Sequence, residues 1–430
     1  MPLFKSKQEF GWSMYDWANS AFATTVMAGF FPIFFKEYWS AGVEVTASTA
    51  MLGFANSLSG IFVAVLAPIL GAIADSGNHK KKFLIFFAYL GALAAGSLFL
   101  VAEGQWLLAV LIYAWGAVGF SGANIFYDAL LPALASENRI DLLSAIGYAM
   151  GYLGGGLLFA FNVWMTLQPA TFGLADAGEA VRISFLSVAI WWGVFTLPVI
   201  LFVPEPRLRA AVKTKNAMRA GWQQLQRTFK KIRHLRTIFL FLMAYWLYID
   251  GVDTIVRMAV DYGLSIGFKR DDLILALLIT QFVGFPSAIF FGRMGEKIGA
   301  RRAIFIAIGV YMLVVVWAVQ MTERYEFYAL AVTIGFVQGG IQALSRSFYS
   351  RLIPHDQAAE FYGFYNLLGK FAVIFGPILI GLTGLISRSS RVGIASLAIL
   401  FLAGGILLYF VDEQKGREEA QYLKLNARTE

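Results

Sequence analysis

Gly292-Arg293-Met294-Gly295-Glu296-Lys297-Ile298-Gly299-Ala300-Arg301-Arg302 is a short charged stretch between two long apolar runs. The stretch from Gly71 to Lys82 has the same order: a glycine, an acid four residues later, a second glycine and a basic cluster. It also lies between apolar runs. The shift from Gly71 to Gly292, and from Asp75 to Glu296, is 221 residues, about half of the 430-residue chain. The sequence therefore predicts one membrane unit that occurs twice.

A second motif tests this repeat. Phe126-Tyr127-Asp128-Ala129-Leu130-Leu131-Pro132 recurs as Phe348-Tyr349-Ser350-Arg351-Leu352-Ile353-Pro354, with a shift of 222 residues. The paired glycine, acid and basic-cluster loops resemble the signature loop of the major facilitator superfamily of transporters, which joins the second and third helices of each half. The first copy departs from that loop, because Ser76 replaces the usual basic residue and Gly77 comes one position early. The resemblance implies two six-helix bundles.

The composition is that of a polytopic membrane protein. Hydrophobic residues make up 58% of the chain and charged residues 14%, which is too apolar for the surface of a soluble enzyme. The chain has no cysteine, so disulfides and thiolate metal sites are excluded. Its histidines, His79, His234 and His355, all lie in expected cytoplasmic loops. We therefore expect no catalytic residue, no metal site and no cofactor.

Hydropathy predicts an all-α polytopic membrane protein with twelve transmembrane helices in two six-helix bundles. The expected spans are 11–36, 47–73, 83–102, 106–131, 141–167, 183–203, 237–263, 272–291, 302–321, 326–350, 360–386 and 391–411. The expected domains are an N-terminal bundle (1–204), a cytoplasmic linker with an amphipathic helix (205–236), a C-terminal bundle (237–411) and a mobile cytoplasmic tail (412–430).

Basic residues predict the orientation of these spans. Twenty-five of the 35 Lys and Arg residues fall on the side shared by the two termini, and seven fall on the opposite side. This bias places both termini in the cytoplasm. We expect the membrane to be a bacterial inner (plasma) membrane. The net charge of +8 therefore reflects membrane topology, and no nucleic-acid partner is expected. The basic linker is interpreted as a connector held by anionic lipid or as a regulatory element.

Polar side chains inside the spans are candidates for function, because charge is costly in a bilayer. They gather on one helical face in the first, fourth, seventh and tenth spans, with help from the eleventh. In the major facilitator fold, which the chain resembles, helices 1, 4, 7 and 10 line the central cavity. The predicted substrate and coupling cavity comprises Tyr15, Asp16, Asn19, Asn124, Tyr127, Asp128, Tyr245, Asp250, Asp253, Arg257, Gln338, Gln342, Arg346, Asn366 and Lys370.

Some of these residues have a structural alternative. Asp128 and Arg346 lie near the cytoplasmic ends of their helices and could pair with each other or with signature-loop charges to hold the gate closed. Asp253 and Arg257 have the spacing of a self-neutralising i, i+4 pair.

Two further residues are candidates for contact with the transported species. Lys370 could bind a substrate carboxylate or phosphate, or only counter Asp16 or Asp128. Asp250 lies nearest the expected bilayer midplane and is the predicted proton carrier.

The signature loops supply the predicted gate residues Asp75, Glu296, Arg301 and Arg302. An acid in such a loop can accept hydrogen bonds from the N-terminus of a neighbouring helix and can bridge to a basic residue. Either contact would stabilise one conformation of the transporter.

A narrower resemblance begins in the first span. The stretch from Tyr15 to Val26, Tyr-Asp-Trp-Ala-Asn-Ser-Ala-Phe-Ala-Thr-Thr-Val, together with Phe126 to Pro132, is similar to the autophagy-related vacuolar amino-acid effluxers and their bacterial relatives. The resemblance implies export of neutral amino acids. We therefore predict a monomeric secondary transporter, not an enzyme, that works by alternating access and is coupled to protons. The alternatives are a lipid or lysolipid flippase of the same fold and a membrane-embedded transferase.

Overall fold

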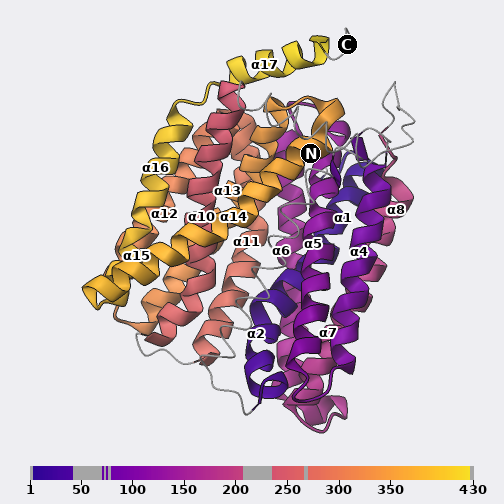
Figure 1. Ribbon diagram of the computed structural model, residues 1–430, viewed down its shortest axis with the longest axis vertical. Coiled ribbons are helices and arrows are strands. Elements are labelled where there is room, and N and C mark those ends of the chain that lie inside the picture. The colour runs from indigo at the N-terminus through magenta and orange to yellow at the C-terminus, as the bar shows by residue number, and fades with distance from the viewer. Residues whose placement is uncertain are drawn as a thin grey trace. The chain divides into compact units, whose positions relative to one another are not determined.

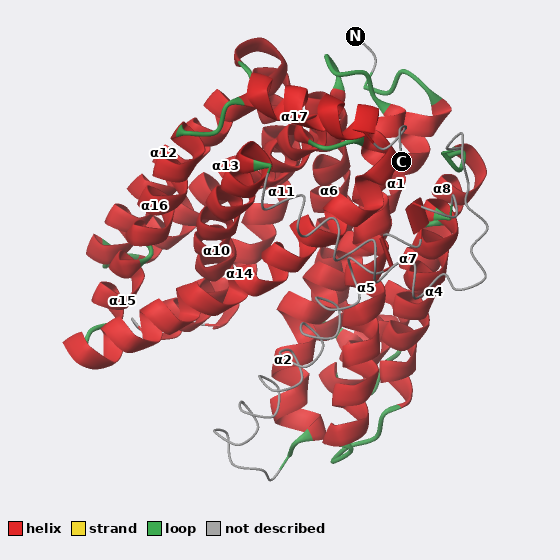
Figure 2. Ribbon diagram, turned by 45° about the horizontal axis from the view of Figure 1, so that its top comes forward, coloured by secondary structure: helices red, strands yellow, loops and turns green. Residues whose placement is uncertain are grey.

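The computed structural model describes residues 3–41, 70–71, 74–75, 79–206, 235–265 and 270–426. Within these ranges every regular element is a helix or a helical turn (Figures 1 and 2). The expected amphipathic linker helix and nearly all of the expected span 47–73 lie outside the described residues. So do the side chains of Arg257 and Lys370.

Ten described helical segments are long and apolar enough to cross a membrane. They are Lys7–Trp39, Lys80–Leu100, Trp106–Leu134 (α5), Ile140–Leu167 (α6), Ala177–Phe202, Arg236–Val256, Asp272–Ile298, Ala300–Gln320 (α12), Arg324–Leu352 (α13) and Arg391–Tyr409. The eleventh expected span coincides with α14, Ala358–Ser387. The all-helical membrane fold is therefore confirmed for the described part of the chain.

Several of these segments combine more than one element. The first consists of α1 (Lys7–Ala21), π-helical turns at Phe22–Phe30 and Phe35–Trp39, and α2 (Phe31–Phe34) between them. The others are listed here with their parts: α4 (Lys80–Ser97) with a 3-10 turn at Leu98–Leu100, α7 (Ala177–Phe195) with α8 (Leu197–Phe202), and α15 (Ser390–Ser396) with α16 (Ala398–Tyr409). The seventh and eighth expected spans lie within α10 (Arg236–Ser265) and α11 (Arg270–Ile298).

The second signature stretch is a helix end rather than a loop. α11 continues through Gly292 and Glu296 to Ile298, and α12 begins at Ala300. Gly299, the one residue between them, has φ = 89°. This left-handed conformation is readily adopted by glycine, so the turn depends on the glycine that ends the motif.

The described chain forms two compact units. Unit 1 comprises 1–66, 80–127 and 150–205, and unit 2 comprises 67–79, 128–149 and 206–430. Unit 2 thus includes the end of α5 and the first turns of α6, which belong to the first half of the sequence. Inside unit 1, α6 packs closely on α1: a Cβ on Gly154 would lie 2.7 Å from the backbone oxygen of Trp17. Small residues allow such close helix packing in membranes.

The C-terminal tail, which its mixed charge predicts to be mobile, is helical over most of its described part. It contains the helix α17 (Glu413–Asn426), which packs on other parts of unit 2. A Cβ on Gly416 would lie 2.5 Å from the Leu352 side chain, and the Glu419 carboxylate accepts hydrogen bonds from Thr237 N (3.3 Å) and Oγ1 (3.1 Å). Charged side chains make many of these contacts, so apolar periodicity did not reveal them.

Candidate transport and gate residues

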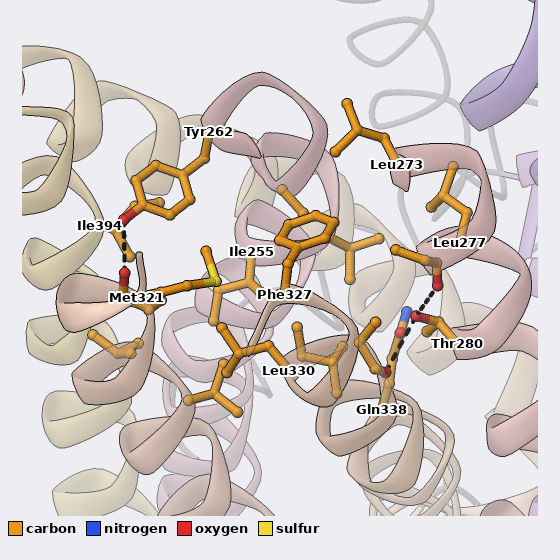
Figure 3. Close-up of a pocket in the computed structure, with 18 of the residues that line it drawn as sticks. Ile255, Tyr262, Leu273, Leu277, Thr280, Met321, Phe327, Leu330, Gln338 and Ile394 are labelled. Atoms are coloured by element: carbon orange, nitrogen blue, oxygen red, sulfur yellow. Dashed lines mark hydrogen bonds between the residues drawn. The ribbon is translucent and has the colours of Figure 1, made fainter. Parts of the chain in front are cut away.

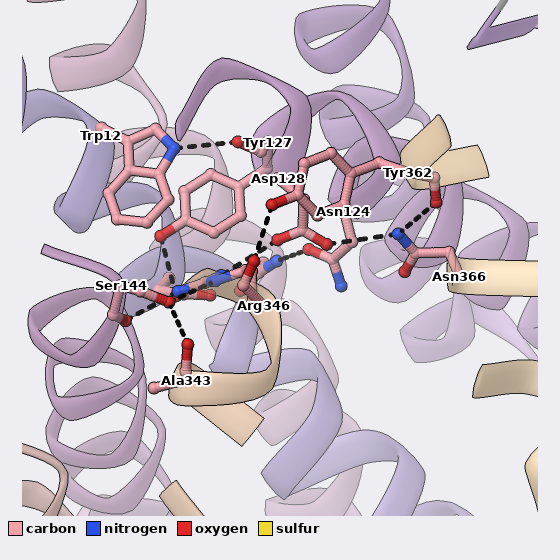
Figure 4. A network of polar contacts seen from close by, with 11 residues as sticks. Trp12, Asn124, Tyr127, Asp128, Ser144, Ala343, Arg346, Tyr362 and Asn366 are labelled. Carbon is pink, nitrogen blue, oxygen red and sulfur yellow. Dashed lines mark hydrogen bonds and ion pairs between the residues drawn. The ribbon is translucent and has the colours of Figure 1, made fainter. Parts of the chain in front are cut away.

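In unit 1 the polar faces expected on the first and fourth spans meet. The Tyr127 hydroxyl donates to Asp16 Oδ2 (2.8 Å), and Asn19 Nδ2 donates to Asn124 Oδ1 (2.6 Å). Trp12 Nε1 donates to the Tyr127 carbonyl (2.9 Å), and the two rings stack at 4.3 Å (Figure 4). Asp16 and Asn19 are buried. The four predicted residues therefore form two polar bridges between α1 and α5, one helical turn apart.

In unit 2 Asp128, at the end of α5, forms an ion pair with Arg346 of α13. Arg346 Nη1 lies 3.0 Å from Asp128 Oδ1, and the two side chains are 2% and 9% exposed. The guanidinium also donates from Nε to Ser144 Oγ (2.9 Å) and from Nη2 to the Ser144 carbonyl (2.8 Å) (Figure 4). Each guanidinium nitrogen thus has an acceptor, as a buried arginine requires.

Other groups complete the surroundings of this pair. Asn366 Nδ2 donates to Asp128 Oδ2 (3.2 Å), and the Tyr362 hydroxyl donates to the Arg346 carbonyl (2.9 Å). The Arg346 guanidinium also lies 4.4 Å from the centre of the Tyr148 ring, at cation–π distance. A buried pair held in this way is costly to break, because removing one partner leaves the other charge uncompensated.

Asp141, in the first turn of α6, was not among the predicted residues. Its carboxylate is 1% exposed and accepts hydrogen bonds from Ser347 Oγ (2.6 Å) and Arg351 Nη2 (2.6 Å). The repeat offers a signal for it, since Glu360, 219 residues later, is an acid in the first turn of α14 and is also buried. We refer to Asp128, Asp141, Ser144, Arg346 and Arg351 as the inter-half cluster, because the first three come from the first half of the sequence and the last two from the second half.

The first signature loop contacts the N-terminus of α14. Asp75 is buried, and its two carboxylate oxygens accept hydrogen bonds from the backbone N–H groups of Ala359 (3.2 Å) and Glu360 (2.8 Å). Helix N-termini favour such an acid, because their first N–H groups lack partners in the helix. A Cβ on Gly71 would lie 2.3 Å from the Ala359 carbonyl, so this approach requires glycine.

The second signature stretch makes an equivalent contact with α6. A Cβ on Gly292 would lie 2.4 Å from Ala145 Cβ. The acids of the two signature stretches differ in burial: Glu296 is exposed, whereas Asp75 is buried. Arg302 is also exposed, and Arg301 Nη2 donates to the Tyr409 carbonyl at the end of α16. The gate roles of Glu296, Arg301 and Arg302 remain predictions.

Helix α17 adds an outer layer to the inter-half cluster. Arg417 bridges Glu137 (2.7 Å), which follows α5, and Glu413 (2.7 Å), and Glu413 also lies 3.8 Å from Arg351. Partial burial lowers the pKa of Arg417, but hydrogen bonds and charge from Glu413 and Glu137 raise it more, so the net shift is upward. These pairs are partly exposed, so each contributes little by itself.

Asp250, the predicted proton carrier, joins α10 to α14. Its carboxylate is 1% exposed and accepts hydrogen bonds from the Gly376 N–H (3.1 Å to each oxygen) and from Thr254 Oγ1 (3.1 Å). Gly376 precedes Pro377, which lies inside α14 and provides no N–H of its own. Asp250 therefore has a structural contact in addition to its predicted role.

The remaining predicted residues lie at several places in unit 2. Tyr245 is buried and stacks on Tyr365 at 4.1 Å, in a tyrosine cluster that the sequence analysis missed. Asp253 and Gln342 are half-buried. The suggested pairing of Asp253 with Arg257 and the role of Lys370 fall on side chains outside the described part. Gln338 lines a cavity inside unit 2.

Comparison with known proteins identifies the family. A family model described as "Vacuole effluxer Atg22 like" matches residues 5–421. The chain belongs to the Atg22-like family of the major facilitator superfamily. This Atg22-like chain is 40% identical over 420 residues to the uncharacterized MFS-type transporter YxiO of Bacillus subtilis (strain 168), covering 97% of each chain. It is 24% identical over 469 residues to autophagy-related protein 22 of Yarrowia lipolytica, covering 88% of this chain and 78% of that protein.

Solved structures support the same fold. The proton:xylose symporter XylE has a TM-score of 0.72 at 13% identity, covering 97% of this chain and 98% of that one. The human organic anion transporter MFSD10 has a TM-score of 0.71 at 13% identity, covering 94% and 99%. At this identity the likeness concerns the fold alone. Together with the family match, it makes the Atg22-like chain an integral membrane protein and a secondary transporter.

Proposed function

We propose that this Atg22-like transporter exports neutral amino acids from the cytoplasm by alternating access, as a monomer in a bacterial inner membrane with both termini cytoplasmic. The inter-half cluster is the observation that carries the alternating-access part of the proposal. It joins Asp128, Asp141 and Ser144 to Arg346 and Arg351, so separation of the two halves at this end must break a buried ion pair. We assign the cluster to the cytoplasmic gate in its closed state.

The signature contacts support the same assignment. Gly71 and Asp75 from the first half meet the start of α14, and Gly292 from the second half meets α6. Two close contacts from duplicated motifs, each made with the other half of the sequence, suit a gate that opens by rocking of one half against the other. Asp75 would stabilise the closed gate through its hydrogen bonds to the α14 N-terminus.

The proposed substrate and direction rest on relatives. The matching family model is described as a vacuole effluxer, and the first-span motif is similar to that of amino-acid effluxers. An amino acid carries both charges, so it requires polar partners in a membrane. The predicted cavity residues supply carboxylates, amides and a guanidinium for this purpose.

Proton coupling is assigned to Asp250. It is a buried carboxylate whose hydrogen bonds within the described part of the chain come from neutral donors, Gly376 N–H and Thr254 Oγ1. Protonation removes a negative charge and changes its bonds to α14. It would therefore alter a contact between α10 and α14, which gives proton binding a route to a change in helix packing.

A ligand screen tests the substrate class. We expect neutral amino acids to raise the midpoint of thermal unfolding of the purified transporter, because a ligand that binds only the folded state stabilises it. The screen includes peptides, sugars and lysolipids. Stabilisation by lysolipids without any response to amino acids would replace the amino-acid proposal with the flippase alternative.

A further inference from the structure

Unit 2 contains a cavity that Gln338, one of the predicted transport residues, lines together with residues outside the transport proposal. It lies among α10, α11, α12, α13 and α15 and has a volume of about 90 Å³ (Figure 3). Its walls are mainly aliphatic and aromatic, and none of the lining residues that the structure describes is charged.

The polar groups that line this cavity differ in whether they have hydrogen-bond partners. The Tyr262 hydroxyl donates to the Ala318 carbonyl (2.6 Å), and Thr280 Oγ1 lies within hydrogen-bond distance of the carbonyls of Ala276 (2.9 Å) and Ala331 (3.3 Å). Gln338 Oε1 is buried and has no hydrogen-bond partner among the described residues. A buried acceptor without a donor is unfavourable, so a ligand that donates to Gln338 would satisfy it.

The labelled side chains in Figure 3 show where this acceptor lies. Tyr262 and Met321 are on one side of the view, Thr280 and Gln338 are on the other, and Phe327 lies between the two groups. The cavity is thus lined by apolar groups along most of its length and has the unpartnered oxygen near one end. That arrangement suits a linear molecule with an apolar body and one polar end.

We propose that this cavity binds an alkyl chain that ends in an uncharged hydrogen-bond donor, with the donor at Gln338 Oε1. A charged head is disfavoured, because no described lining side chain carries a compensating charge and a buried charge needs one. The helices that form the cavity cross the membrane, which can supply such molecules. A monoacylglycerol and a protonated fatty acid share this chemistry.

Photo-crosslinking of the full-length protein in lipid nanodiscs tests the site. The probe is a long-chain alcohol that carries a diazirine on its alkyl chain, and crosslinked peptides are mapped by mass spectrometry. We expect crosslinks in α10, α11 and α13. Unlabelled 1-decanol should compete at an about fivefold lower concentration than its methyl ether, the ratio that a hydrogen bond worth about 1 kcal/mol produces.

Variants separate the cavity from the lipid-facing surface. Gln338→Leu should abolish the preference for the alcohol over the ether, and Ala276→Phe, which fills the cavity, should abolish the crosslinks. Leu313→Phe is the control, because Leu313 is 68% exposed and does not line the cavity. Equal competition by alcohol and ether in the wild-type protein, or crosslinks that no competitor reduces, would overturn the proposal. If Ala276→Phe fails to fold, the alcohol-to-ether ratio in the wild type and in Gln338→Leu still decides.

Two further competitors distinguish a monoacylglycerol from a protonated fatty acid as the natural ligand. Competition by monodecanoylglycerol would assign the site to a monoacylglycerol, and competition by decanoic acid only at acidic pH would assign it to a neutral fatty acid. Competition by decanoate that is equally strong at alkaline pH would contradict an uncharged head.

Discussion

Replacing Asp128 with Asn removes the charge that compensates Arg346 and leaves the shape of the side chain nearly unchanged. Arg346 is 2% exposed and Asp128 is 9% exposed, so solvent screens the pair very little. Loss of one partner of a buried ion pair costs about 3–5 kcal/mol. The remaining bonds from Arg346 to Ser144 favour the lower value. If water hydrates Arg346 when the gate opens, Asp128→Asn destabilises only the closed state. A destabilisation of about 3 kcal/mol then raises the population of the open state about a hundredfold.

Cysteine labelling measures this population, because the chain has no cysteine of its own. Ser350, near the end of α13, is 0% exposed, and Ser350→Cys is nearly isosteric. We expect a maleimide to label Ser350→Cys slowly, and about a hundredfold faster when Asp128→Asn is added. In a double-mutant cycle, Arg346→Gln together with Asp128→Asn should have much less effect than the product of the two single changes, because both remove the same pair.

A second ion pair provides the control. Arg324 and Asp272 lie 2.9 Å apart at the other ends of α13 and α11, and Arg324 is 55% exposed. Asp272→Asn should leave labelling of Ser350→Cys within a few-fold of the unchanged rate. An equal rate with and without Asp128→Asn, in protein that remains folded, would refute the assignment of the cluster to a gate.

Three other predictions concern packing, the tail and topology. Gly376→Ala places a Cβ 2.0 Å from Thr254 Oγ1 and should destabilise the protein by about 1–3 kcal/mol. Gly381→Ala on the same helix is the control, because its Cβ would meet no described atom within 4 Å. Equal midpoints of thermal unfolding for the two variants would contradict this packing. Arg417→Ala should raise the labelling rate of Ser350→Cys by at most about fivefold, because the ion pairs of Arg417 with Glu137 and Glu413 are partly exposed. A hundredfold rise would show instead that α17 is the main element that keeps the gate closed. In intact cells an impermeant maleimide should label Cys at Ala175 and not at Lys213 or Glu418, and labelling at Ala175 only after permeabilisation would reverse the topology.

The sequence predicted the elements that depend on apolar length. Each expected span with described residues over most of its length coincides with a helix, because a bilayer requires about 20 apolar residues per crossing. The exact ends of the helices were harder to predict from the sequence. The α11–α12 turn depends on the backbone conformation of Gly299, whereas the charges around it suggested a longer loop.

The free-energy cost of placing charge in a bilayer was enough to single out several candidate residues from the sequence. Asp16, Asp128, Asp250 and Arg346 were found because charge inside a span is rare, and the structure buries each of them. Their partners were harder to find. Whether Arg346 binds Asp128 or a signature-loop acid depends on the packing of helices more than 200 residues apart, and periodicity contains no such information.

Asp141 was missed for a different reason. It lies at a helix start, where an acid is unremarkable, and only comparison with Glu360 in the repeat sets it apart. The α17 contacts were missed because they pair charges on a polar segment. The cavity at Gln338 arises from side-chain packing among five helices, so sequence spacing places Gln338 on a helical face without defining its neighbours.

Transport into proteoliposomes tests the central claim most directly. Purified protein is reconstituted, and uptake of radiolabelled neutral amino acids is measured with an imposed pH gradient and, separately, as exchange without a gradient. We predict gradient-driven accumulation by the wild-type protein. Asp250→Asn should lose this accumulation and retain exchange, because exchange needs no net proton movement. Full gradient-driven accumulation by Asp250→Asn would exclude Asp250 as the proton carrier, and the absence of both uptake and exchange in the wild type, for every neutral amino acid tested, would contradict the proposed function.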